Sequence, residues 1–220
     1  MTLQTTSLAL VHDNSYFGAT SPILGDRWRV EVDPTFGGLQ FMTAVADYRK
    51  YVMPIRPFTF AVRALHIGRY GKDGEDNRFF PMFIGYSSFV RGYDRGSFQP
   101  SECAGGTAQD PCPVFDQLFG SRILVANAEL RFPPFGLIGA GGGYYGILPI
   151  EAGIFYDAGV AWTTTDKAKF LGGTRNLVRS TGVSFRMNLL GYAIGQMDIV
   201  HPFDRPGKNW MVRLSLTEGF

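Results

Sequence analysis

The sequence predicts an all-β protein, an antiparallel transmembrane β-barrel, from three observations. Apolar and polar residues alternate with a period of two over segments of about ten residues, the span of a tilted membrane strand. Of the 220 residues, 45% are hydrophobic and only 18% are charged, and 28 are glycine. Aromatic residues lie near many segment ends, as in the interfacial girdles of membrane barrels. A soluble all-β protein is the alternative.

Four segments show the alternation most clearly. Near the N-terminus, Trp28, Val30 and Val32 alternate with charged residues. The same pattern recurs in Leu124 to Phe132, Val183 to Leu189 and Trp210 to Leu216. Each segment therefore has one apolar and one polar face. No helix of useful length is expected, and about nine strands are expected, at residues 6–13, 25–35, 39–52, 57–70, 120–132, 147–162, 177–189, 191–202 and 208–220.

The links between these strands differ in length. Those at 53–56 and 189–191 are tight, whereas those at 163–176 and 71–119 are long. Long and short links alternate between the two sides of an outer-membrane barrel, and the short ones are periplasmic. The scheme holds if the C-terminus is periplasmic. It has two exceptions, a long Gly-rich link at 133–146 on the periplasmic side and a short link at 34–38 on the outer side.

The strand number bears on closure of the barrel. Bacterial single-chain barrels have even strand numbers, and a barrel of about eight strands is filled by its own side chains. The long loop 71–119 would not fit inside such a barrel. We therefore expect one barrel domain over residues 1–220 that is the C-terminal portion of a larger barrel, or is completed by other strands. The alternative is that the long loop stays outside the barrel.

Composition and motifs exclude several functions. A net charge of +2 is too small for a nucleic-acid partner. The three histidines lack metal-ligand spacing, so neither a metal nor another cofactor is expected. Gly141, Gly143 and Gly146 fit a dinucleotide-binding pattern, but no helix follows them. We therefore expect no enzymatic activity. The first residues do not resemble a signal peptide, which fits a cytosolic protein or a mature or truncated form.

The two cysteines lie in a polar segment rich in glycine and proline. Cys103 and Cys112 have no histidine or further cysteine near them, which argues against zinc. A disulfide within the loop, formed in an oxidising compartment, fits better. The bridge would add about 2–3 kcal/mol of stability. Two free thiols are the alternative.

The long loop contains Phe89, Val90, Arg91, Gly92 and Tyr93. This segment resembles the V/I-R-G-F/Y motif of the BamA/TamA superfamily of outer-membrane barrels, the bacterial surface antigens, whose sixth extracellular loop folds into the lumen. Three further blocks resemble that family in the same order, and they lie at 125–133, 155–162 and 180–202. Two departures are the absence of a recognisable POTRA domain and a strand number below the family's.

The resemblance implies a function at the bacterial outer membrane. It implies insertion or translocation of proteins there, through a seam of weakly paired strands to which a client strand adds. The implied partners are the lipid bilayer, client outer-membrane proteins, and strands that complete the barrel. The alternative is a passive barrel that anchors or exports a passenger fused upstream.

The family's loop arginine contacts carboxylates of the barrel wall. By alternation, Glu129 and Asp157 lie on faces opposite the apolar ones, so both should point into the lumen toward Arg91. A guanidinium has five donors and can serve two carboxylates. The alternative is a solvated Arg91, with the carboxylates paired to Arg131 or Arg186.

The C-terminal segment carries a second resemblance. A terminal aromatic residue after alternating apolar residues resembles the β-signal that the barrel assembly machinery recognises. Val212, Leu214, Leu216 and Phe220 fit this signal, whereas Glu218 stands where an apolar residue is usual. An ordinary edge strand is the alternative.

Overall fold

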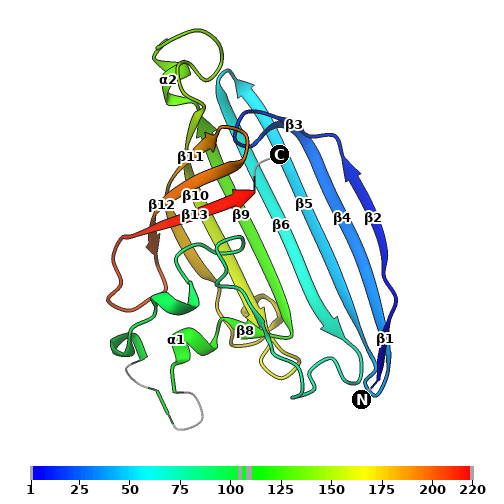
Figure 1. The fold of residues 1–220 in the computed structure, drawn as a ribbon. Helices are drawn as coiled ribbons and strands as arrows, with labels where there is room; N and C mark the ends of the chain where they lie inside the picture. The colour runs from blue at the N-terminus through cyan, green and yellow to red at the C-terminus, as the bar shows by residue number, and fades with distance from the viewer. Residues whose placement is uncertain (1, 104–105, 108–110, 219–220) are drawn as a thin grey trace.

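The computed structural model describes residues 2–103, 106–107 and 111–218. Most of the chain forms a single, strongly curved antiparallel sheet (Figure 1). All nine expected strands are present. The sheet contains β1 (Leu3–Thr5), β2 (Leu8–Asp13), β3 (Tyr16–Phe17), β4 (Pro22–Gly37), β5 (Phe41–Ile55), β6 (Phe58–Tyr70), β9 (Arg122–Phe132), β10 (Ile150–Trp162), β11 (Val178–Leu189), β12 (Ala193–Pro202) and β13 (Met211–Glu218).

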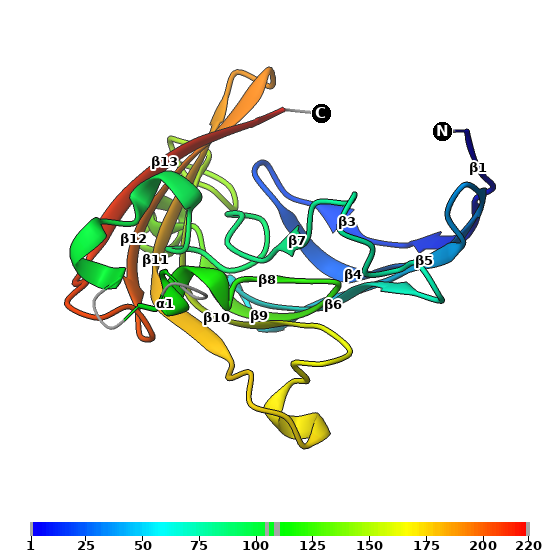
Figure 2. The same cartoon turned by 90° about the horizontal axis from the view of Figure 1, so that it is seen from below.

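The sheet is open. Its order is β1-β4-β5-β6-β9-β10-β11-β12-β13, with β2 and β3 also paired to β4. Thus β1, β2 and β3 together form one edge, and β13 forms the other. Within the described residues neither edge has a further strand partner, and Figure 2 shows the two edges on opposite sides of a wide opening. The prediction of a partial barrel is therefore confirmed.

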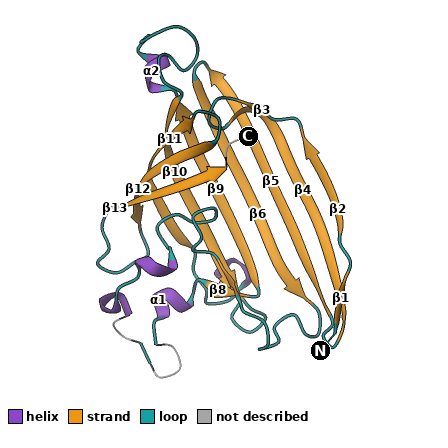
Figure 3. Ribbon diagram, viewed as in Figure 1, coloured by secondary structure: helices purple, strands orange, loops and turns teal. Residues whose placement is uncertain are grey.

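Helices are short and confined to the connections (Figure 3). In the described part of the chain they are α1 (Pro113–Asp116), α2 (Pro134–Leu137) and three 3-10 helices, Arg95–Ser97, Pro100–Cys103 and Lys169–Leu171. A separate small ribbon joins β7 (Met82–Phe83) to β8 (Phe119–Gly120). Among the described residues no helix is both long and apolar enough to cross a membrane.

The connections define two ends of the sheet. Residues 71–121 connect β6 to β9 at the lower end of Figure 1, which we call the loop end. The segments 163–177 and 203–210 lie at the same end. The opposite turn end has the tight links between β5 and β6 and between β11 and β12. Both expected exceptions occur, because only residues 38–40 separate β4 from β5 and α2 lies in the long connection at the turn end.

The two faces of the sheet differ as the alternation predicts. On the convex face, apolar side chains such as Val30, Leu214 and Leu216 are exposed. On the concave face, the carboxylates of Glu129 and Asp157 are buried. The described part of residues 71–121 crosses this concave face, and a hydrophobic core forms between it and the sheet. That core contains Leu65, Phe83, Ile84, Val90, Tyr93, Leu118, Ile123, Val125, Ala161 and Val178.

Candidate functional site

The loop motif packs closely on the concave face of β10. Val90 is fully buried in the core, and its backbone N–H donates to the carbonyl oxygen of Ile84 at 3.3 Å. Gly159 of β10 lies directly beneath it, since a Cβ at this glycine would be only 2.6 Å from Cγ2 of Val90. A glycine at this position of the strand therefore lets the loop backbone approach the sheet.

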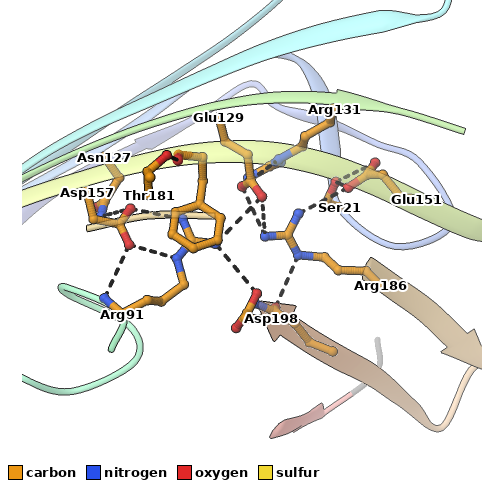
Figure 4. A network of polar contacts seen from close by, with 12 residues as sticks. Ser21, Arg91, Asn127, Glu129, Arg131, Glu151, Asp157, Thr181, Arg186 and Asp198 are labelled. Carbon is orange, nitrogen blue, oxygen red and sulfur yellow. Dashed lines mark hydrogen bonds and ion pairs between the residues drawn. The ribbon is translucent and has the colours of Figure 1, made fainter. Parts of the chain in front are cut away.

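Arg91 is buried and forms a forked ion pair with Asp157 (Figure 4). Its Nε donates to Oδ2 at 2.7 Å and its Nη2 to Oδ1 at 2.9 Å. The Arg91 backbone N–H also donates to Oδ2, at 3.2 Å. The guanidinium carbon lies 3.3 Å from the ring centre of Phe155, which adds a cation–π contact. Asn127 Nδ2 donates to Asp157 Oδ1 at 2.8 Å, so several donors share this fully buried carboxylate.

Glu129 has a different set of partners. Arg131 Nη2 and Arg186 Nη2 each lie 2.9 Å from it, whereas Arg91 Nη1 is 3.7 Å away. Arg91 Nη1 is also 3.8 Å from Asp198. The two carboxylates that the sequence predicts as partners of Arg91 therefore differ in how closely they contact its guanidinium group. Asp157 accepts the forked hydrogen bonds, and Glu129 is bound mainly by the two arginines of the barrel wall.

The next two motif residues anchor the loop toward β11 and β12. Gly92 has a φ of 86°, a left-handed backbone conformation that glycine adopts most readily. A Cβ there would also lie only 2.8 Å from Val200 Cγ1, so both the backbone conformation and the available space favour glycine. The Tyr93 hydroxyl donates to the Arg179 carbonyl at 2.8 Å and accepts from the Asp204 N–H at 3.2 Å. Burial is the main reason that the pKa of Tyr93 lies above its ordinary value.

A second buried arginine, Arg205, has no signal in the sequence pattern. It lies in the β12–β13 connection, and its Nε and Nη2 donate to Glu102 at 2.8 and 2.9 Å. Nη1 donates to the Gly92 carbonyl at 2.6 Å and to Ser97 Oγ at 2.8 Å, and Nη2 donates to the Ser97 carbonyl at 2.8 Å. All five donors of this guanidinium are therefore used to join the long loop to the last hairpin.

Burial alone would raise the pKa of Glu102, but hydrogen bonds from Arg205 and from the Gln99 N–H outweigh it and lower the pKa.

The neighbouring Cys103 forms a disulfide with Cys112, and their Cα atoms are 4.4 Å apart. The predicted disulfide is thus present in the same part of the loop. It lies close in sequence to the Glu102–Arg205 pair.

The C-terminal residues are only partly described. Val212, Leu214 and Leu216 are exposed on the convex face of β13, at the sheet edge. Phe220, the terminal residue of the proposed β-signal, lies outside the described residues. Within the described chain no group of three or more His, Cys, Asp or Glu side chains is arranged to hold a metal ion. The chemistry this site offers is ion pairing and hydrogen bonding that position a loop.

Comparisons with known proteins agree with this geometry. Residues 7–199 match the model of the Omp85 superfamily domain. The structure is similar to the crystal structure of BamA from Haemophilus ducreyi lacking POTRA domains 1–3, with a TM-score of 0.68 and 15% sequence identity. That match covers 97% of this chain but 42% of the BamA chain, so this chain spans less than half of it. No curated protein sequence matches the chain. The chain belongs to the Omp85 superfamily, and it is an outer-membrane β-barrel protein of bacteria.

Proposed function

We propose that this chain acts in the insertion or translocation of proteins at the bacterial outer membrane. The observation that carries the proposal is the open sheet, in which the outer edge of β13 has no strand partner within the described residues. An unpaired edge presents backbone N–H and C=O groups that bind another extended strand. A client strand could add there by backbone hydrogen bonds, which depend little on its sequence.

The loop site supports this role by holding the sheet in shape. Arg91 fastens the loop to β10, and Arg205 fastens the same loop to the connection before β13. Within the membrane the cost of leaving backbone polar groups unpaired is several kcal/mol per group, so an edge strand needs a partner. With the long loop bound to its concave face, the curved sheet keeps its shape while one strand paired to its edge is replaced by another.

A photo-cross-linking experiment tests the proposal. A benzoyl-phenylalanine at Leu214, on edge strand β13, is compared with one at Tyr156, which is also exposed on the convex face but lies on β10 in the middle of the sheet. The full chain is reconstituted in liposomes and an unfolded outer-membrane protein is added. The proposal expects a client adduct at Leu214 and none at Tyr156.

Two results would contradict it. Equal cross-linking at both positions would mean that the client only touches the convex surface. An adduct at Leu214 with a constant partner, unchanged by the client, would favour the second function, a passive barrel that anchors or exports an upstream passenger. Client folding is followed in parallel by heat-modifiable gel migration.

A further inference from the structure

The connection between β10 and β11 folds back over the convex face of the sheet. It comprises residues 163–177, and in Figure 2 it projects away from the concave side. Its residue Ala168 is buried against Val160 and Trp162, whose side chains leave the convex face of β10. Phe170 packs edge-on against Trp162, with ring centres 6.1 Å apart. Because the convex face is the membrane face, this connection lies at the rim where the bilayer meets water.

The connection has a defined shape of its own. The Lys169 N–H donates to the Arg175 carbonyl at 2.8 Å, and the Arg175 N–H donates to the Lys167 carbonyl at 3.1 Å. Gly173 donates to the Ala168 carbonyl at 3.1 Å. These backbone bonds fix the conformation of the segment, and the burial of Ala168 against β10 fixes its position on the sheet.

A cavity of about 820 Å³ lies between this connection and the one between β12 and β13. Its apolar lining includes Phe170, Leu177 and Phe203, each of which is about half exposed. Lys169 and Arg179 also line it. An exposed apolar surface next to cationic groups is typical of the membrane interface, where long side chains place their charge among the headgroups.

One cationic side chain of the cavity has no ion-pair partner among the described residues. The cationic residues that line the cavity are Lys169, Arg175, Arg179 and Arg205. Arg205 is paired with Glu102. Arg179 is paired with Asp204, at 3.1 Å from Nη2 to Oδ1. Arg175 is paired with Asp166 at 3.4 Å. No ion pair within the described part of the chain involves Lys169, and its side chain is exposed. The cavity therefore offers one free ammonium group beside an apolar surface.

We propose that this cavity binds the phosphate-bearing headgroup of an anionic membrane lipid. Lys169 contacts the phosphate, and Phe170, Leu177 and Phe203 contact the first methylenes of the acyl chains. Phe170 contacts Trp162 and Phe203 contacts Tyr156, two residues on the convex face of β10, so the apolar part of the lining borders the membrane face and selects a lipid over a soluble anion. At the loop end, which we take as extracellular, this lipid belongs to the outer leaflet.

The amount of anionic lipid that stays bound to the protein tests the role of the Lys169 ammonium group. The chain is placed in nanodiscs of phosphatidylcholine with a minor fraction of phosphatidylglycerol or lipid A, extracted, and examined by native mass spectrometry for retained lipid. Lys169→Gln is expected to lose about fivefold of the anionic-lipid retention, since a lysine near an anionic surface contributes about 1 kcal/mol. Lys167→Gln is the matched control, because Lys167 is exposed on the same connection but does not line the cavity.

Equal losses in the two variants would show diffuse attraction of lipid to the rim and would overturn the proposal, as would no loss in either. A second measurement tests location. Phe170→Cys carries an NBD label, and its fluorescence should be quenched by lipid with a doxyl group near the headgroup. The control Phe80→Cys, 95% exposed in the long loop, should not be quenched. An unquenched label at Phe170 would also overturn the proposal.

Discussion

Replacing Arg91 with alanine removes the guanidinium that fastens the long loop to the concave face. Asp157 is fully buried and would keep Asn127 as its side-chain donor, at 2.8 Å. Removing one partner of a buried ion pair costs about 3–5 kcal/mol, because the remaining charge is left uncompensated. If all of that free energy shifts the equilibrium between the closed and the open loop, the open fraction rises by about two to four orders of magnitude.

Limited proteolysis in detergent measures this change, because cleavage follows the open population when opening is fast relative to cleavage. The Arg91→Ala protein should be cut within residues 71–121 much faster than the wild type and should assemble less well. Arg91→Lys should be nearly as sensitive, since an ammonium group cannot reproduce the fork of bonds to Asp157. Arg95→Ala is the control, because Arg95 is exposed in the same loop. Wild-type resistance in Arg91→Ala would refute the reasoning.

Three further variants probe the same loop. The pKa of Glu102 lies below its ordinary value of 4.5, so its ion pair stabilises the loop above that pH and is lost as the pH falls through the lowered pKa; Glu102→Gln should be protease-sensitive at pH 7 and show no further change on acidification. Gly159→Ala should crowd Val90 and cost about 1–3 kcal/mol in thermal unfolding, whereas Gly142→Ala, with open space around it, should not. Alkylation without reduction should leave the mass of the unfolded chain unchanged, whereas a Cys103→Ser protein should gain one alkyl group.

The strands are predictable because each carries a signal of its own. Period-two alternation identifies nine strands, since one face of each meets lipid and the other meets the lumen. The short pieces β1 and β3 cannot be separated from their neighbours in this way, because two or three residues are too few to show a period. The face of Asp157 also follows from alternation, and the motif resemblance supplies its partner in the loop.

The Arg205–Glu102 ion pair could not be predicted from the sequence. The two residues are 103 positions apart, and each lies in a connection without a periodic pattern. Their contact depends on the path of the long loop over the last hairpin, which is a tertiary feature. The same holds for residues 163–177, because their fold onto the convex face depends on Ala168 fitting against Val160 and Trp162.

Strand directions constrain how the sheet can close. Every neighbouring pair in the sheet is antiparallel, and β2 and β13 lie an even number of steps apart along it, through β4, β5, β6, β9, β10, β11 and β12. The two edges therefore run in the same direction, from the loop end to the turn end. If they met, they would pair in parallel, unlike the antiparallel strands of bacterial outer-membrane barrels. Two copies joined edge to edge about an axis along the membrane normal would meet the same obstacle. An all-antiparallel closure thus requires an odd number of additional strands between β13 and β2, and a single added strand, as proposed for a client, is the smallest insertion that satisfies this requirement.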